Sequence, residues 1–149
     1  MAEYFGQTQN VALNSPIVFE SSIPCRNGLI FHEDGTGIFI LKGKTNNCFA
    51  RYQLTFNGNI SVPEEGELTP IGVAISVNGE PRPTSLAIFT PQAVDELGNV
   101  TSTAIVTVPC GCCFSASARY IDATTLDPET EPTGVITVQN ANLVITRVA

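Results

Sequence analysis

The stretch ARYQLTFN, Ala50 to Asn57, alternates apolar and polar side chains without a break. Successive side chains of an extended strand point to opposite faces, so one side of this stretch is apolar and the other is polar. The apolar side consists of Ala50, Tyr52, Leu54 and Phe56. The pattern predicts a long β-strand with one face in a hydrophobic core and one face outside it.

Two more stretches alternate in the same way, IGVAISVN (Ile71 to Asn78) and FSASARY (Phe114 to Tyr120). The second face of Ile71 to Asn78 has only small side chains, which would let a second sheet or a neighbouring subunit pack closely. Turn-forming pairs separate these runs: Asp34-Gly35, Asn57-Gly58, Asn78-Gly79 and Gly98-Asn99. Many short strands joined by such turns predict an antiparallel sandwich or barrel. The only helix candidate is TPQAVDELG, Thr90 to Gly98.

Composition restricts the possible partners. The chain has 149 residues, which suits one domain, and only 14 % of them are charged, against a usual quarter. Such a chain is expected to cover part of its surface with a partner, and copies of itself are the simplest one. The net charge of −7 and the scattered basic residues disfavour nucleic acid. No apolar run approaches the ~18 residues of a membrane span.

The start of the chain, MAEYFGQTQN, has no basic segment followed by an apolar one. It therefore lacks the pattern of a secretory signal. We expect synthesis in the cytoplasm, with lysis or assembly into a particle as the routes to a final, extracellular location.

The order of the strand features resembles a known superfamily. TGIFILKGKTNNCFARYQLTFNGN, residues 36–59, resembles the central signature of the tumour necrosis factor (TNF) and complement globular-head proteins, with Gly37, Phe39 and Tyr52 at matching points. VAISVNGEPRP (73–83) resembles their next hairpin. STAIVTVPCGCCFSASARY (102–120) and VQNANLVITRVA (138–149) resemble the later apolar hairpin and the buried final strand. The resemblance covers residues 16–149 and is strongest to the bacterial and phage branch, such as the head domain of exosporium collagen-like proteins.

The resemblance implies an all-β fold, an antiparallel jelly-roll β-sandwich of about ten strands that assembles as a homotrimer. Residues 16–149 would form the TNF-like domain, and residues 1–15 an N-terminal arm that docks the domain or is a frayed tail. No Gly-x-y stalk precedes the domain, and the turn at residues 110–113 lacks the charged Gly-Asp pair of animal members. The expected core comprises Ile38, Phe39, Tyr52, Leu54, Phe56, Val73, Ile75, Val106, Phe114, Leu143 and Ile145.

The sequence contains five cysteines, Cys25, Cys48, Cys110, Cys112 and Cys113. Several kinds of chemistry are open to them. The last three are too tightly spaced for ideal tetrahedral zinc ligands, and His32 is the only histidine that could complete a site or act as a base. Disulfides or buried reduced thiols are the remaining alternatives. Cys25 and Cys48 flank a predicted hairpin, and they would face each other or approach the 110–113 turn. The odd count leaves one thiol unpaired or paired between subunits.

Two acidic loops are candidate binding loops, PEEGEL and DATTLDPETEPTG. Each contains an acidic cluster, which is Glu64, Glu65 and Glu67 in the first and Asp127, Glu129 and Glu131 in the second. Their spacing does not match a helix-loop-helix calcium site, and solvated loop tips are the plainer interpretation.

No catalytic fingerprint is present in the sequence, so we expect neither an enzyme nor a cofactor. The sequence favours a structural surface protein: a homotrimeric knob on a phage virion, as capsid decoration or fibre head, with capsid, tail or coat proteins as partners. The alternatives are a spore or cell-surface adhesive module that recognises a glycan or protein, and a disulfide-linked fibre subunit.

Overall fold

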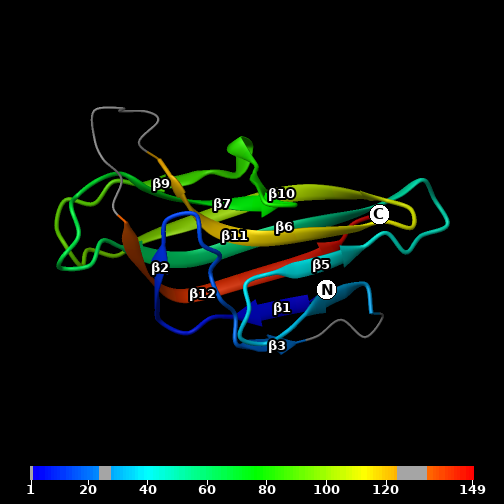
Figure 1. The fold of residues 1–149 in the computed structure, drawn as a ribbon, viewed down its shortest axis with the longest axis horizontal. Coiled ribbons are helices and arrows are strands. Elements are labelled where there is room, and N and C mark those ends of the chain that lie inside the picture. Colours follow the sequence, from blue (N-terminus) through cyan, green and yellow to red (C-terminus); the bar gives the residue numbers. More distant parts are fainter. Residues whose placement is uncertain (1, 24–27, 124–133) are drawn as a thin grey trace.

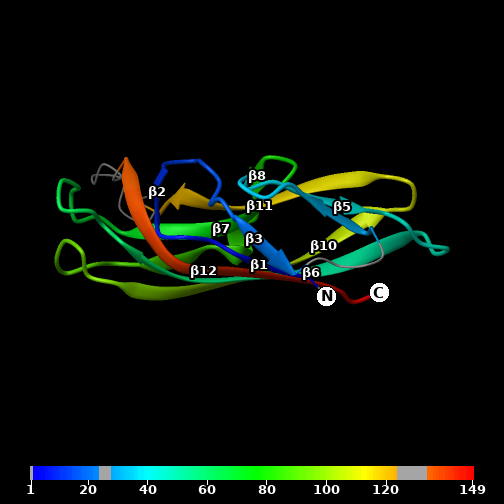
Figure 2. The same cartoon turned by 90° about the horizontal axis from the view of Figure 1, so that it is seen from below.

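The protein is a sandwich of two antiparallel β-sheets (Figure 1). A computed structural model describes residues 2–23, 28–123 and 134–149. Sheet A has the strand order β10-β6-β12-β1-β3, with β2 beside β12, and sheet B has the order β4-β5-β11-β7-β8, with β9 beside β7. Figure 2 shows the two layers nearly edge-on. The predicted all-β antiparallel sandwich is confirmed.

The described residues form twelve strands, against about ten predicted, and one short 3-10 turn. Those of sheet A are β1 (Ala2–Phe5), β2 (Gln9–Ala12), β3 (Ser21–Ile23), β6 (Phe49–Ser61), β10 (Gly98–Pro109) and β12 (Val135–Arg147). Those of sheet B are β4 (Ile30–His32), β5 (Phe39–Lys42), β7 (Ile71–Val77), β8 (Glu80–Pro81), β9 (Ala87–Phe89) and β11 (Cys113–Asp122). The 3-10 turn is η1 (Pro83–Ser85).

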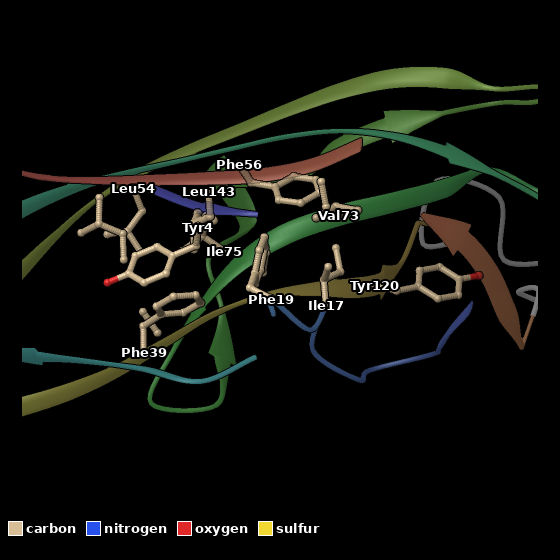
Figure 3. Close-up of a cluster of buried hydrophobic side chains, with 14 of the residues drawn as sticks. Tyr4, Ile17, Phe19, Phe39, Leu54, Phe56, Val73, Ile75, Tyr120 and Leu143 are labelled. Carbon is tan, nitrogen blue, oxygen red and sulfur yellow. The ribbon is translucent and has the colours of Figure 1, made fainter. Parts of the chain in front are cut away.

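The alternating stretch at Ala50 to Asn57 lies in β6, at the centre of sheet A. β6 pairs with β10 along its whole length, from Ile60 opposite Gly98 to Phe49 opposite Pro109, and with β12 on its other edge. Its apolar side chains face those of sheet B, and Figure 3 shows Leu54 and Phe56 among them. The predicted core residues that are fully buried are Phe39, Tyr52, Leu54, Phe56, Val73, Ile75, Val106, Leu143 and Ile145.

Two predicted core residues are not fully buried. Ile38 is 36 % exposed because its neighbour Phe39 points into the core, and adjacent side chains of an extended chain point to opposite sides. Phe114 is only partly buried, because it lies in the first residues of β11, at the end of the sandwich, where the core is incomplete. The prediction was therefore wrong for Ile38 and overstated for Phe114.

The N-terminal residues belong to the sandwich. β1 pairs with β12, with Ala2 opposite Ile145, and β2 pairs with the start of the same strand. Ala2, Tyr4 and Val11 are buried in the common core. The segment expected to form a separate arm is thus, over its described residues, part of sheet A, because a few alternating apolar side chains are enough to hold short strands against β12.

The segment Thr90 to Gly98 forms no helix, contrary to the sequence-based expectation. Asp95 adopts a left-handed conformation with φ of 59°, and its N–H donates to the Val62 carbonyl at 2.8 Å. The Glu96 carboxylate accepts hydrogen bonds from the N–H groups of Gln92 (2.6 Å) and Ala93 (3.2 Å). A residue at a positive φ cannot continue a right-handed helix, so the left-handed Asp95 and its bond to Val62 close the segment as a loop.

The small face of β7 is covered within the chain itself. Ala74 and Ser76 are buried, and a Cβ added to Gly72 would lie 2.8 Å from the Leu86 side chain and 3.2 Å from the Ala87 carbonyl oxygen. The small side chains therefore let the chain pack closely against itself there.

Candidate functional site

The β5–β6 connection and the β10–β11 turn meet at one end of the sandwich, near the C-terminus (Figure 1). We call residues 42–48 and 109–113 the cysteine tip. The N–H of Gly43 donates to the Cys112 carbonyl at 2.8 Å, and the N–H of Gly111 donates to the Gly43 carbonyl at 3.0 Å. A Cβ on Gly43 would lie 2.0 Å from the Pro109 carbonyl oxygen, so only glycine permits this close approach of two backbones.

Four thiols are exposed at the cysteine tip, those of Cys48, Cys110, Cys112 and Cys113, and all four are free. Cys48 and Cys110 lie one position beyond the β6–β10 ladder, in which Phe49 is opposite Pro109. The N–H of Cys110 donates to the Cys48 carbonyl at 2.9 Å, so the two residues continue the same register. The Cys110 thiol points to the Thr45 carbonyl, with Sγ and O 3.3 Å apart. The predicted approach of Cys48 to the 110–113 turn is therefore observed, while Cys25 lies outside the described residues.

Several basic residues lie at the same end of the sandwich as the thiols. Lys42 is opposite Cys113 in the β5–β11 register, and Arg51 stands over the Phe49 ring, 4.9 Å from its centroid. The Arg147 guanidinium donates to the Lys44 carbonyl at 2.7 Å. A shallow pocket beside the tip is lined by Lys44, Thr45, Asn46, Asn47 and Arg147. This end therefore has a positive local charge, although the chain as a whole is acidic.

The acidic candidate loop lies at the other end of the sandwich. Glu64, Glu65 and Glu67 are exposed in the connection that follows β6, and the backbone bond from Asp95 to Val62 brings the loop before β10 alongside it. Asp127, Glu129 and Glu131 lie outside the described residues. In the described ranges, no group of three or more His, Cys, Asp or Glu is placed to hold a metal ion. The same ranges contain no helix that is long and apolar enough to cross a membrane.

His32 is packed inside the protein. Its side chain is 1 % exposed and its ring stacks on that of Phe39, with centroids 4.3 Å apart. Its Nε2 atom lies 2.8 Å from the Thr36 carbonyl oxygen. The expectation of a strand-end histidine is correct, but the side chain is buried in the core, whereas the four described thiols are exposed.

The face of sheet A that points away from the core is almost free of charge. The strands of this sheet contain only three charged residues, Glu3, Arg51 and Arg147. Side-chain amides and hydroxyls bond to one another across the strands: Asn99 Nδ2 donates to Asn57 Oδ1 at 3.0 Å and to Asn59 Oδ1 at 3.1 Å. We call this surface the outer face. The sequence signal for this face is the alternation in GNVTSTAIVTV, residues 98–108, whose outward positions carry no charged residue.

The comparisons with known proteins bear on the fold. No family model and no curated protein matches the sequence. Among solved structures, the globular domain of zebrafish complement 1qA protein superposes with a TM-score of 0.60 at 13 % identity, over 96 % of this chain and 94 % of that one. The TNF protein Eiger from S. frugiperda superposes with a TM-score of 0.60 at 10 % identity, over 100 % of this chain and 92 % of that one. The chain has the TNF/C1q-like jelly-roll fold.

The fold implied by the sequence resemblance is therefore confirmed, and its bacterial or phage branch stays a prediction. In this jelly roll the cysteine tip and the acidic loop occupy opposite ends of the long strands. The outer face of sheet A lies between them (Figure 2).

Proposed function

We propose that this jelly-roll protein is a non-enzymatic structural module that assembles as a homotrimer through the outer face of sheet A. The trimer would form a knob on a phage virion, as capsid decoration or fibre head. The observation that supports this most directly is the scarcity of charge on the outer face. A sheet face that stays exposed to solvent normally carries many charged side chains, and the outer face does not.

The residues of the outer face suit a contact between identical subunits. Ile105 is 54 % exposed in the middle of β10, and Phe5 (39 %) and Phe49 (41 %) are exposed on the same sheet. Around them, the Asn57–Asn99 and Thr101–Asn57 hydrogen bonds hold polar side chains in fixed positions. Apolar side chains among preorganised, uncharged polar groups form a surface that loses little hydration energy when it is buried.

The native mass in solution tests the assembly. We expect light scattering to give three chains for the parent and one chain for Ile105→Asp, because a carboxylate in the contact would be buried without a partner. The matched control is Ile88→Asp, which changes a 39 % exposed isoleucine on β9 of sheet B and should leave the trimer intact. A parent that is monomeric at all concentrations, or two variants with the same mass, would refute assembly through the outer face.

Whether the protein is a component of a virion needs a separate experiment. Mass spectrometry of gradient-purified virions from the source culture should detect this chain at a fixed ratio to the capsid protein. Its absence from virions and its presence in purified spore coats would favour the spore alternative. This outcome would leave the trimer measurement unaffected.

A second candidate function is recognition of a glycan. The amides of Asn57, Asn59 and Asn99 and the hydroxyl of Thr101 cluster on the outer face, and such groups exchange hydrogen bonds with sugar hydroxyls. Binding of a labelled glycan to the monomeric Ile105→Asp variant, lost in Asn99→Ala, would favour this candidate. If only the trimer binds, the site is made by more than one subunit.

A further inference from the structure

We propose that Cys48 and Cys110 are an oxidisable pair that forms an intrachain disulfide across the end of sheet A. The proposal is independent of the assembly state, because both residues belong to one chain. It also selects one pairing out of those that the five cysteines allow.

The backbone geometry supports this pairing. The Cys110 N–H donates to the Cys48 carbonyl at 2.9 Å, which makes these residues a hydrogen-bonded, directly opposite pair of the antiparallel ladder. The Cα atoms of such pairs lie about 5.5 Å apart. Disulfides join Cα atoms at about 4.4–6.8 Å, so this pair lies inside the usable range.

The side chains point to the same side of sheet A. Cys48 continues the side of Ala50 and Tyr52, and Cys110 continues the side of Val106 and Val108; these four residues are buried in the core. The two cysteines lie just beyond the end of that core and are exposed. Their Cβ atoms therefore project from neighbouring positions on one side of the sheet, where an oxidant can reach the two thiols.

Only a small rearrangement is needed to form the bond. The Cys110 thiol now points to the Thr45 carbonyl, so its side chain must rotate toward Cys48. The Cβ atoms of a hydrogen-bonded pair lie near the upper end of the range of about 4.5–5.5 Å, and a disulfide needs about 3.5–4.5 Å, so they must approach by roughly 1–2 Å. The pair lies one position beyond Phe49 and Pro109, the last pair of the β6–β10 ladder, so the approach of the two side chains takes place outside the buried core.

The neighbouring thiols are poorer partners. Cys112 and Cys113 are consecutive, and consecutive Cα atoms are about 3.8 Å apart, which is shorter than disulfides normally span. Cys113 is opposite Lys42 in the β5–β11 register, on sheet B. These two residues therefore remain as exposed thiols when Cys48 and Cys110 are joined.

The chemistry requires an oxidant, and a small anionic disulfide such as oxidised glutathione suits the site. One protein thiolate attacks a sulfur of oxidised glutathione, forms a mixed disulfide and releases one glutathione thiolate. The second protein thiolate then attacks the protein sulfur of the mixed disulfide and releases the second glutathione thiolate. The two cysteines lose two electrons and two protons in total, and the oxidant becomes two thiols. Lys44 and Arg147, which line the pocket beside the tip, attract its carboxylates.

Peptide mapping after oxidation tests the pairing. The variant Cys112→Ser/Cys113→Ser keeps Cys25, Cys48 and Cys110. Trypsin cleaves after Lys44 and Arg51, so Cys48 is released in the peptide TNNCFAR, residues 45–51. Cys110 and Cys25 lie in other, distinguishable tryptic peptides. After treatment with oxidised glutathione we expect the Cys48 and Cys110 peptides to be linked, with a mass about 2 Da lower than the two thiol forms together, and the chain to run as a monomer on a denaturing non-reducing gel.

Controls make the result decisive. Adding Cys48→Ser or Cys110→Ser to the double variant should abolish the linked peptide and leave the melting temperature of the reduced protein unchanged. The proposal is overturned if Cys48 is linked to Cys25, if the link joins two chains, or if both thiols still react with iodoacetamide at oxidant ratios that oxidise Cys25. In the parent chain, a Cys110–Cys112 link with free Cys48 would also overturn it.

Discussion

The close approach of Gly43 to Pro109 makes a quantitative prediction about the cysteine tip. In Gly43→Ala the new Cβ would lie 2.0 Å from the Pro109 carbonyl oxygen, whereas ordinary contacts begin at 3.4 Å, so the two backbones must separate by about 1.4 Å. Two backbone hydrogen bonds would then be broken, from the Gly43 N–H to the Cys112 carbonyl (2.8 Å) and from the Gly111 N–H to the Gly43 carbonyl (3.0 Å). Two backbone hydrogen bonds contribute about 2 kcal/mol, and the remaining strain costs about 1–3 kcal/mol.

The loss of chain freedom in the unfolded state offsets about 0.4–1 kcal/mol of this, so Gly43→Ala should lower the free energy of unfolding by about 3 kcal/mol. Urea unfolding followed by fluorescence or circular dichroism measures it. The control is Gly134→Ala, whose Cβ would meet nothing within 4 Å and whose φ is not left-handed, so its stability should stay within about 0.5 kcal/mol of the parent. The argument is refuted if Gly43→Ala unfolds at the same urea concentration as the control.

Three further changes test the core and its polar contacts. Phe56→Ala should cost about 3–5 kcal/mol in urea unfolding because Phe56 is fully buried, and the 41 % exposed Phe49→Ala should cost much less; equal losses would contradict the core assignment. Ser85→Ala should cost about 1–3 kcal/mol, because it leaves the Ile75 N–H, which now donates to Ser85 Oγ at 3.0 Å, buried without a partner. Burial, and secondarily the Asp122 carboxylate, raise the pKa of Tyr120 to about 12. The stability due to the neutral phenol is therefore complete below pH 10, the unfolded pKa, and is lost as the pH rises toward 12. A pH titration of the melting temperature should show a smaller fall between these values for Tyr120→Phe than for the parent.

The fold was largely predictable because alternation is a local signal. In Ala50 to Asn57 every second side chain belongs to the core, so the face of β6 could be assigned without knowing its partners. The same logic failed where the decisive contact is distant in sequence. Ala2 and Tyr4 are buried only because β12, at the other end of the chain, offers them an edge to pair with. The helix expected at Thr90 to Gly98 is absent because Asp95 bonds to Val62, which no local pattern reveals.

The candidate site was less predictable for the same reason. The concentration of cysteines at residues 110–113 was evident, but the direct opposition of Cys48 and Cys110 depends on the β6–β10 register, which joins residues far apart in the sequence. The outer face is hard to recognise in the sequence because its Asn and Thr residues, which turn and loop segments also contain, alternate with core residues and are mixed with a few apolar residues such as Ile105. Its shortage of charge becomes visible only when β1, β6, β10 and β12 are placed side by side.

The positions of these features make the two proposals complementary. Cyclic symmetry gives every subunit the same orientation along the axis, so a trimer built on the outer face with its axis along the strands gathers three cysteine tips at one end and three acidic loops at the other. The Cys48–Cys110 bond would lie within each subunit and leave the contact between subunits unchanged. Cys112 and Cys113 would remain exposed at the basic end, so a covalent link that these two residues form between such knobs should lie there and not at the end that contains Glu64 and Glu65.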